Sequence, residues 1–494
     1  MQMEVKQVVV ADVIRYKIMK KYITFLLLAC SLLSQSQQVT DTTVSFKKRV
    51  LETAEIDFLL SYYKQDGQHS AVSGGIGSEK LTDIVSNLVV NIPLNEDDVL
   101  TIDTGISAYT SASSSNINPF NSSGASGGGD DDDREGATSP TGTPWQASSG
   151  ASAQDRLFSF TANYSHSSDS RDFIWNADVS FSNEYDYTSI GFGGGIAKLF
   201  NKKNSEIGIK LNAYLDQWRP IYPTELHEYE KYGSQFQTSG YFSGVTILDQ
   251  SGLASTAYNP TNFNALNKVN RNSYSASFSF SQIVSKRAQF SLFFYLLSQE
   301  GLLSTPYQRI YFADKSNYYI GDSKYISNYE TSQNKGVYRL ADDIERLPGT
   351  RFKLPIGGRF NFYINETFKL RTYYRYYTDD WGITAHTANF EIPIKISDKF
   401  TILPMYRYYT QNQSTYFAPF EKHLSSEEFY TSDYDLSTFK SNQIGMGVSY
   451  LDIFSEKRIF TLGLKNIDFR YNYYKRSDGL HAGIITLGMK LIMQ

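Results

Sequence analysis

Positively charged side chains in residues 351–377 fall on alternate positions, because every arginine and lysine in this stretch has an odd number. Successive side chains of a β-strand point to opposite faces, so this spacing gathers the charges on one face of paired strands. Arginine keeps its charge at physiological pH and binds carboxylate or phosphate oxygens through paired hydrogen bonds. The pattern therefore predicts a polar wall that binds or guides anions. Extended to the next strands, the predicted basic ladder consists of Lys353, Arg359, Lys369, Arg371, Arg375, Lys395 and Arg407.

Carboxylates take the same inward positions in the first half of the chain. Two facing walls of opposite charge would create a transverse field that orders water and polar solutes. The alternative is that the two sets neutralise each other as structural ion pairs. The predicted acidic wall consists of Glu55, Asp57, Asp103, Asp178 and Glu184.

Motifs for catalysis or metal binding are weak. His69 lies near Asp66, and His227 lies between glutamates, but no zinc-protease motif or nucleophile elbow is present. The aspartate run at residues 130–133 lacks the spaced alternation of a calcium loop. The glycines of residues 191–195 depart from the dinucleotide fingerprint. We therefore expect no enzymatic activity, no metal and no cofactor.

Long strands joined in hairpins are the elements that would position these charges. In residues 351–377, apolar and charged residues alternate on both sides of the turn signal Asn365-Glu366. Each arm has about ten residues, the length of a tilted membrane-spanning strand. A soluble sandwich seldom points so many charges at its core, whereas a membrane barrel has lipid outside and water inside.

The alternation recurs along the chain and predicts about sixteen strands. Short polar turns alternate with longer connections, an asymmetry typical of bacterial outer-membrane barrels. A change of parity near Lys465 and Asn466 predicts a β-bulge. Tyr374 and Tyr376, followed by Trp381, predict an aromatic girdle at the membrane interface. The predicted fold is all-β, a transmembrane antiparallel up-and-down β-barrel with short periplasmic turns and long extracellular loops.

Composition agrees with this fold class. The 494 residues include 38 Tyr and 32 Phe, and aromatic girdles require many such residues. The net charge is −4 and no basic domain is present, so we expect no nucleic-acid partner.

The N-terminal region predicts export. A basic start at Met19, a short apolar stretch and small residues make residues 19–36 a secretory signal peptide, and residues 1–18 an upstream extension. The only cysteine, Cys30, lies within this signal, and its lipidation is the alternative. The predicted organisation is 1–36 extension and signal, 37–52 periplasmic lead, and 53–494 barrel. Residues 111–154 form a disordered external loop in this prediction, because they are rich in Ser, Gly and Asp.

The first long loop carries a recognisable pattern. Residues 62–83 read YYKQDGQHSAVSGGIGSEKLTD, and SASS at 111–114 and SGAS at 149–152 follow in the next loop. This pattern resembles the domain-of-unknown-function 3570 family of uncharacterised bacterial outer-membrane β-barrel proteins. The resemblance covers nearly the whole predicted mature chain and implies a large envelope barrel without a settled activity. The aspartate run at residues 130–133 and the ending Met493-Gln494, in place of a terminal aromatic residue, depart from the usual pattern.

These observations predict a barrel in the outer membrane of a Gram-negative bacterium. The leading functional hypothesis is a pore or transporter for small polar or anionic solutes, with outer loops that limit access. The alternative is a non-conducting barrel that acts as a scaffold or docking site for envelope lipoproteins or surface partners. A third hypothesis is an enzyme at the barrel rim. The expected partners are outer-membrane lipid, a small solute and, in the alternative, an envelope protein.

Overall fold

The computed structural model describes residues 49–110, 154–184, 186–267, 269–452 and 457–493. The predicted signal peptide with Cys30, and the predicted disordered loop up to residue 153, lie outside the described residues. None of the helices in the described ranges is long and apolar enough to cross a membrane.

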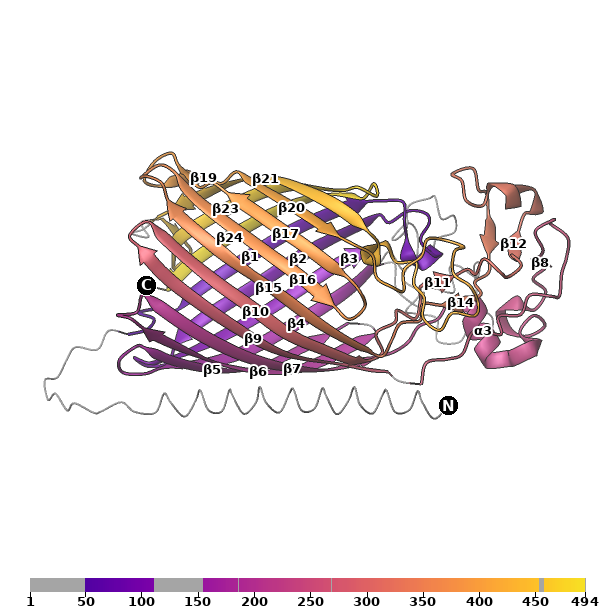
Figure 1. Cartoon of the computed structure of the whole chain (residues 1–494), viewed down its shortest axis with the longest axis horizontal. Helices are drawn as coiled ribbons and strands as arrows, with labels where there is room; N and C mark the ends of the chain where they lie inside the picture. The colour runs from indigo at the N-terminus through magenta and orange to yellow at the C-terminus, as the bar shows by residue number, and fades with distance from the viewer. Residues whose placement is uncertain (1–48, 111–153, 185, 268, 453–456, 494) are drawn as a thin grey trace, which may run out of the picture. The chain divides into compact units, whose positions relative to one another are not determined.

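A single antiparallel sheet closes on itself to form a barrel (Figure 1). Strand β1 (Glu55–Asp66) pairs with β2 (Leu81–Pro93) on one side and with β24 (His481–Met493) on the other. Over the described residues the sheet contains nineteen strand segments. Three of these are short pieces beside longer strands, so sixteen strands form the wall and the predicted fold is confirmed. Closure removes the unpaired edges that would otherwise template aggregation.

The other long strands of the wall follow in chain order: β3 (Asp98–Thr110), β4 (Gln154–Ser167), β5 (Phe173–Asn183), β6 (Tyr187–Phe200), β7 (Ser205–Trp218), β9 (Asn270–Ser285), β10 (Ala288–Gly301), β15 (Thr350–Tyr363), β16 (Lys369–Asp379), β17 (Thr384–Glu391), β20 (Met405–Gln411), β21 (Phe439–Leu451) and β23 (Leu462–Arg476). The short pieces are β18 (Ile394–Lys395), β19 (Phe400–Ile402) and β22 (Arg458–Ile459). Short turns join the strands at the end where β1 begins, which we call the turn end. The long connections lie at the opposite end, which we call the loop end.

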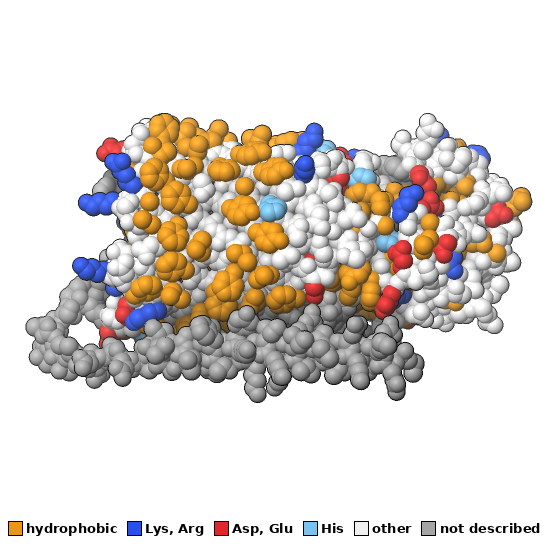
Figure 2. Space-filling view, in the orientation of Figure 1, with side chains coloured by type: hydrophobic (Ala, Val, Ile, Leu, Met, Phe, Trp, Pro, Cys, Tyr) orange, Lys and Arg blue, Asp and Glu red, His pale blue; other side chains and the backbone are white. Residues whose placement is uncertain are grey.

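The outer face of the barrel is apolar because every second strand residue is bulky and hydrophobic. Ile356 of β15 and Tyr374 of β16 are exposed on this face, and Val179 of β5 is equally exposed. Figure 2 shows hydrophobic side chains gathered over the strands, with lysines and arginines beyond them at one end. A surface of this kind suits the hydrocarbon core of a bilayer.

Two local features interrupt the regular ladders. Pro393 and Pro404 separate β17 and β20 from their short continuations, because proline has no N–H to donate. The pairing of β23 with β24 shifts register between Leu464 and Asn466, which confirms the predicted β-bulge.

Three long loops at the loop end pack against one another, and we call them the cap. They comprise residues 219–267, 302–349 and 412–438. Their elements are α3 (Thr224–Tyr232), η2 (Gly233–Gln235), η3 (Gly240–Phe242), β8 (Ile247–Leu248), β11 (Arg309–Ile310), β12 (Tyr319–Gly321), η4 (Ser323–Asn328), β13 (Val337–Arg339), β14 (Asp343–Ile344) and η5 (Tyr434–Leu436). The loop between β1 and β2 contains η1 (Ala71–Ser73). This loop contacts the cap through the hydrogen bond that Arg309 donates to the Val72 carbonyl.

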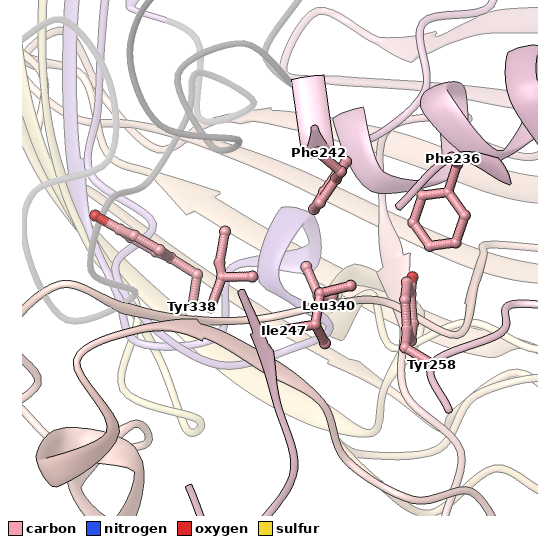
Figure 3. Close-up of a cluster of buried hydrophobic side chains, with 7 residues drawn as sticks. Phe236, Phe242, Ile247, Tyr258, Tyr338 and Leu340 are labelled. Atoms are coloured by element: carbon pink, nitrogen blue, oxygen red, sulfur yellow. The ribbon is translucent and has the colours of Figure 1, made fainter. Parts of the chain in front are cut away.

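The cap has hydrophobic cores of its own. Phe236, Phe242 and Tyr258 of its first loop pack with Leu340 of its second (Figure 3). Ile320 of the second loop belongs to the same cluster. A second cluster joins Leu226 and Tyr311, with Phe420 of the third loop packed against it. The three loops therefore share buried apolar surface, which favours their association.

Candidate functional site: the lumen and its loop end

The arginines of the predicted basic ladder lie on the inner face of neighbouring strands. On β15 and β16, Arg359 pairs in register with Tyr373, and Arg375 pairs with Gly357. On the other side of β16, Arg375 lies opposite Thr387 of β17, and Asn389 of β17 lies opposite Arg407 of β20. The register therefore places Arg359, Arg375 and Arg407 within two residues of one register line on neighbouring strands of one sector of the wall.

Arg371 lies one step nearer the turn end and is an ion-pair partner. Its guanidinium donates to Glu391 of β17 at 2.7 Å. Arg470 of β23 reaches the other oxygen of Glu391, also at 2.7 Å. Glu391 and Arg470 belong to strands that are not neighbours, so this triad bridges part of the lumen wall. Glu391 and Arg470 follow the same parity rule as Arg371, but our sequence analysis did not single them out.

The remaining arginines of this sector differ from Arg371. Arg359 lies over the rings of Phe293 and Tyr373, at 5.7 and 5.6 Å from their centroids. Among the residues that the structure describes, Arg375 and Arg407 form no ion pair. Three buried polar atoms of this sector have no hydrogen-bond partner among the described residues: Arg375 Nε, Thr387 Oγ1 and Asn389 Oδ1. This sector can therefore supply donors to an anionic or polar solute.

The lysines of the predicted ladder occupy more peripheral positions. Lys353 lies near the loop end, in register with Asp379. Lys369 is the first residue of β16, at the turn end, and is exposed. Lys395 lies in β18 and pairs with Asp398 of the adjacent turn at 2.6 Å.

Four members of the predicted acidic wall are bonded to side chains on the adjacent strand or on the next strand but one. Asp178 pairs with Lys210 of β7, and Asp103 accepts a hydrogen bond from Asn87 at 2.7 Å. Glu55 lies between Lys490 and Lys465, at 2.7 and 2.9 Å, and Asp57 also approaches Lys490. Lys210, Lys465 and Lys490 were not among our candidates, although the parity of their strands indicates them. Glu184 lies beyond β5 at the loop end, and burial together with the nearby Asp186 raises its pKa to about 7.

On β7, β16 and β23, the exposure of inward charged side chains falls from the turn end toward the loop end, whereas the ion-paired carboxylates Glu55 and Glu391 near the turn end are only 16% and 10% exposed. On β16 the exposed fraction drops from 52% at Arg371 to 0% at Asp379. On β7 it drops from 47% at Lys210 to 8% at Asp216, and on β23 from 35% at Arg470 to 5% at Arg476. On these strands, charged side chains reach water toward the turn end, and the inward side chains at the loop end are covered.

Two sets of polar contacts close the wall against the cap. Arg351 of β15 donates to Asp379, and its guanidinium lies 4.2 Å from the ring of Trp381. Arg476 of β23 bonds Asp435 of the cap and Asp478, and its guanidinium lies 3.8 Å from the ring of Phe439. Both arginines thus bind residues at the covered end of the lumen.

Trp381 corrects one expectation. It is buried, donates its indole N–H to the Thr350 carbonyl, and packs with Leu303 and Leu347. The prediction that it belongs to the interfacial girdle is therefore wrong, because the cap folds over it. Tyr374 does lie on the outer face, where its hydroxyl contacts His386.

A closed antiparallel barrel with an apolar outer face and a charged, water-exposed lumen defines a transmembrane β-barrel of the outer-membrane type. A sequence profile of the family described as "Protein of unknown function (DUF3570)" matches residues 24–488, and the chain belongs to this family. The resemblance noted in the loop of residues 62–83 is thereby confirmed.

Several solved structures are similar in fold. A bacterial polysaccharide outer membrane secretin is 9% identical, with 90% of this chain and 99% of that chain covered and a TM-score of 0.41. The outer membrane protein opdK from Pseudomonas aeruginosa is 7% identical, with 90% and 100% covered and a TM-score of 0.35. A BenF-like porin from Pseudomonas fluorescens Pf-5 is 8% identical, with 89% and 98% covered and a TM-score of 0.35. At these low sequence identities and TM-scores, the similarity to these structures does not indicate a solute for this chain. No curated protein matches the sequence.

Proposed function

We propose that this barrel is an outer-membrane pore or transporter for small polar or anionic solutes, with the cap limiting access at the loop end. The observation that carries the proposal is the exposure of inward charges such as Arg371 and Lys210 toward the turn end. Side chains can keep that exposure only where the lumen holds water. Barrels of about sixteen strands are wide enough for an aqueous channel.

The distribution of ion pairs supports an anionic preference. The acidic residues of the first strands are bonded to neighbouring side chains, as Asp178 is to Lys210 and Glu55 is to Lys490. These carboxylates therefore do not neutralise the arginines of β16 and β20. Arg375 and Arg407 form no ion pair among the described residues, and arginine suits carboxylate and phosphate oxygens.

Conductance and selectivity in planar bilayers test the proposal. We expect the wild-type barrel to conduct with a weak preference for anions, which falls as salt is raised because the Debye length shrinks. Changing Arg375→Glu and Arg407→Glu together should reverse the preference. The matched control is Lys202→Glu with Lys203→Glu, which changes the net charge equally at an exposed turn.

Two results would contradict parts of the proposal. If the wild-type barrel conducts nothing at any voltage, the pore is wrong and the docking alternative takes its place. The packed cores of the cap favour that alternative over any other, because they hold a preformed surface at the loop end. If the barrel conducts but the double change leaves selectivity untouched, the two arginines do not line the solute path.

A further inference from the structure

A pocket lies on the inner wall at the loop end, on β6, β7, β9 and β10, next to the strands that carry Arg359, Arg375 and Arg407. It measures about 340 Å³ and is lined by Glu184, Tyr187, Asp216, Trp218, Arg271 and Gln299. On β7, Ile207, Leu211 and Leu215 are exposed on the outer face, so Asp216 and Trp218 point inward. A volume of this size is within the range of small-molecule sites.

Two atoms of this pocket are buried and have no hydrogen-bond partner among the described residues. One is a donor, the indole Nε1–H of Trp218, and the other is an acceptor, Oδ1 of Asp216. Asp216 is more than nine-tenths buried, and its register partner on β9 is Arg271. Arg271 lies over the ring of Trp218, at 5.7 Å from its centroid, instead of forming an ion pair with Asp216. Leaving buried polar atoms unpaired is costly, so the site is built for a group that satisfies both.

The need for a donor and an acceptor together selects the ligand class. A hydroxyl group both donates and accepts, so a single polyhydroxylated molecule can bond Asp216 Oδ1 and the Trp218 indole. A cation could bond Asp216 but would leave the indole N–H unpaired and would meet Arg271. An anion could bond the indole but would face Asp216.

The aromatic side chains add a surface for the less polar face of such a molecule. The rings of Tyr187 and Trp218 lie edge to face, with centroids 5.7 Å apart. Burial and Asp186 hold the pKa of Glu184 at about 7, so this carboxyl is protonated in a large fraction of molecules near neutral pH. A protonated Glu184 can also donate to a hydroxyl oxygen, and it lessens the attraction for cations.

We propose that this pocket is a binding site for a neutral polyhydroxylated molecule, a sugar or polyol, at the covered end of the lumen. The site does not depend on whether the barrel conducts. A non-conducting barrel could hold the same ligand, and a conducting one could lack the site.

Binding of D-glucose to the full chain in detergent micelles tests this proposal. With tryptophan labelled by ¹⁵N, the indole resonance of Trp218, assigned from Trp218→Phe, should shift saturably on addition of D-glucose. The indole resonances of Trp175 and Trp381 should stay in place. Asp216→Asn should weaken binding about tenfold, because a bond to a charged acceptor is replaced by a neutral one. The matched control Asp468→Asn changes another inward carboxylate, bonded to Asn466, and should leave the affinity unchanged.

Tetramethylammonium chloride and sodium sulfate serve as the competing probes. The proposal is overturned if D-glucose causes no saturable shift, or if tetramethylammonium or sulfate shifts the Trp218 resonance and D-glucose does not. If Asp216→Asn does not fold, saturation-transfer NMR of D-glucose with Trp218→Phe replaces it, since this change removes the indole donor and keeps an aromatic ring. Unchanged binding in that variant would equally overturn the proposal.

Discussion

At the scale of single residues, buried carboxyl groups make the cap sensitive to pH. Glu345 is fully buried and accepts hydrogen bonds from the Thr305 amide and the Thr431 hydroxyl. Burial and the nearby Asp433 raise its pKa to about 8. Burial also raises the pKa of Glu79, in the loop after β1, to about 7.

The sign of the pH effect follows from these raised values. Between the unfolded pKa, near 4.5, and the folded pKa, near 8, the folded cap binds more protons than the unfolded chain. The free energy of unfolding therefore falls as pH rises through this window. The contribution of a neutral Glu345 is fully present below the unfolded pKa and is lost by about pH 8.

We therefore predict that the amide protons of the cap exchange faster at about pH 7.5 than at about pH 5.5, after correction for intrinsic rates. Barrel amides provide the internal reference and should show little change. Glu345→Gln keeps a neutral side chain at both values and should flatten the dependence. Cap protection that increases with pH in the wild type would contradict the prediction.

The face of the strand that each residue occupies was predictable from the sequence, because the alternation of side chains is a local property of a strand. The alternation around Arg371 and Arg375 indicates that they share a face, and the register of β15 with β16 agrees. Parity does not indicate which charges meet. Glu391 contacts Arg470, 79 positions away on a strand that is not its neighbour, and only the curvature of the closed wall sets that distance.

At the scale of elements, each strand separates lipid from water. Val179 is near the middle of β5 and is exposed on the outer face, whereas the next residue, Ser180, points inward beside Gly191. A charged side chain introduced on the lipid face must be transferred out of water, whereas one introduced on the lumen face can stay hydrated.

Val179→Arg should therefore lower the free energy of unfolding by about 2–4 kcal/mol, the cost of arginine near the bilayer midplane. Ser180→Arg, the control one residue away, should cost much less. Urea unfolding of the two variants in lipid vesicles, followed by tryptophan fluorescence, measures the difference. Equal losses would show that β5 does not present its odd-numbered residues to lipid.

The sequence was informative for strands and uninformative for the cap, for a physical reason. A strand in a membrane wall repeats every two residues, so its pattern is readable without knowing its neighbours, and even the bulge beside Lys465 leaves a change of parity. The cap has no such period. A buried ion pair of the cap joins Arg309 to Glu225, 84 positions apart, and the hydrophobic cores of the cap combine residues of three loops. Composition alone identified these segments only as loops.

At the scale of the whole molecule, the two ends of the barrel have different properties. The turn end leaves Arg371 and Lys210 in water, whereas the loop end buries Asp379 and Arg476. The cap is joined to the wall by polar contacts such as that between Arg476 and Asp435. If the barrel conducts as proposed, access through the loop end depends on how firmly the cap is held.

This dependence gives a prediction for the intact barrel. Since raising the pH deprotonates Glu345 and weakens the cap, we expect the fraction of time that the channel is open to increase between about pH 5.5 and about pH 7.5. Single-channel recordings in planar bilayers at constant salt measure that fraction directly. Glu345→Gln should hold it constant over the same range, and Glu428→Gln, which neutralises an exposed carboxylate of the cap, serves as a matched control that keeps the pH response. If the open fraction rises equally in wild type and Glu345→Gln, the pH-sensitive group is elsewhere. If it falls with pH in the wild type, the cap does not close the lumen.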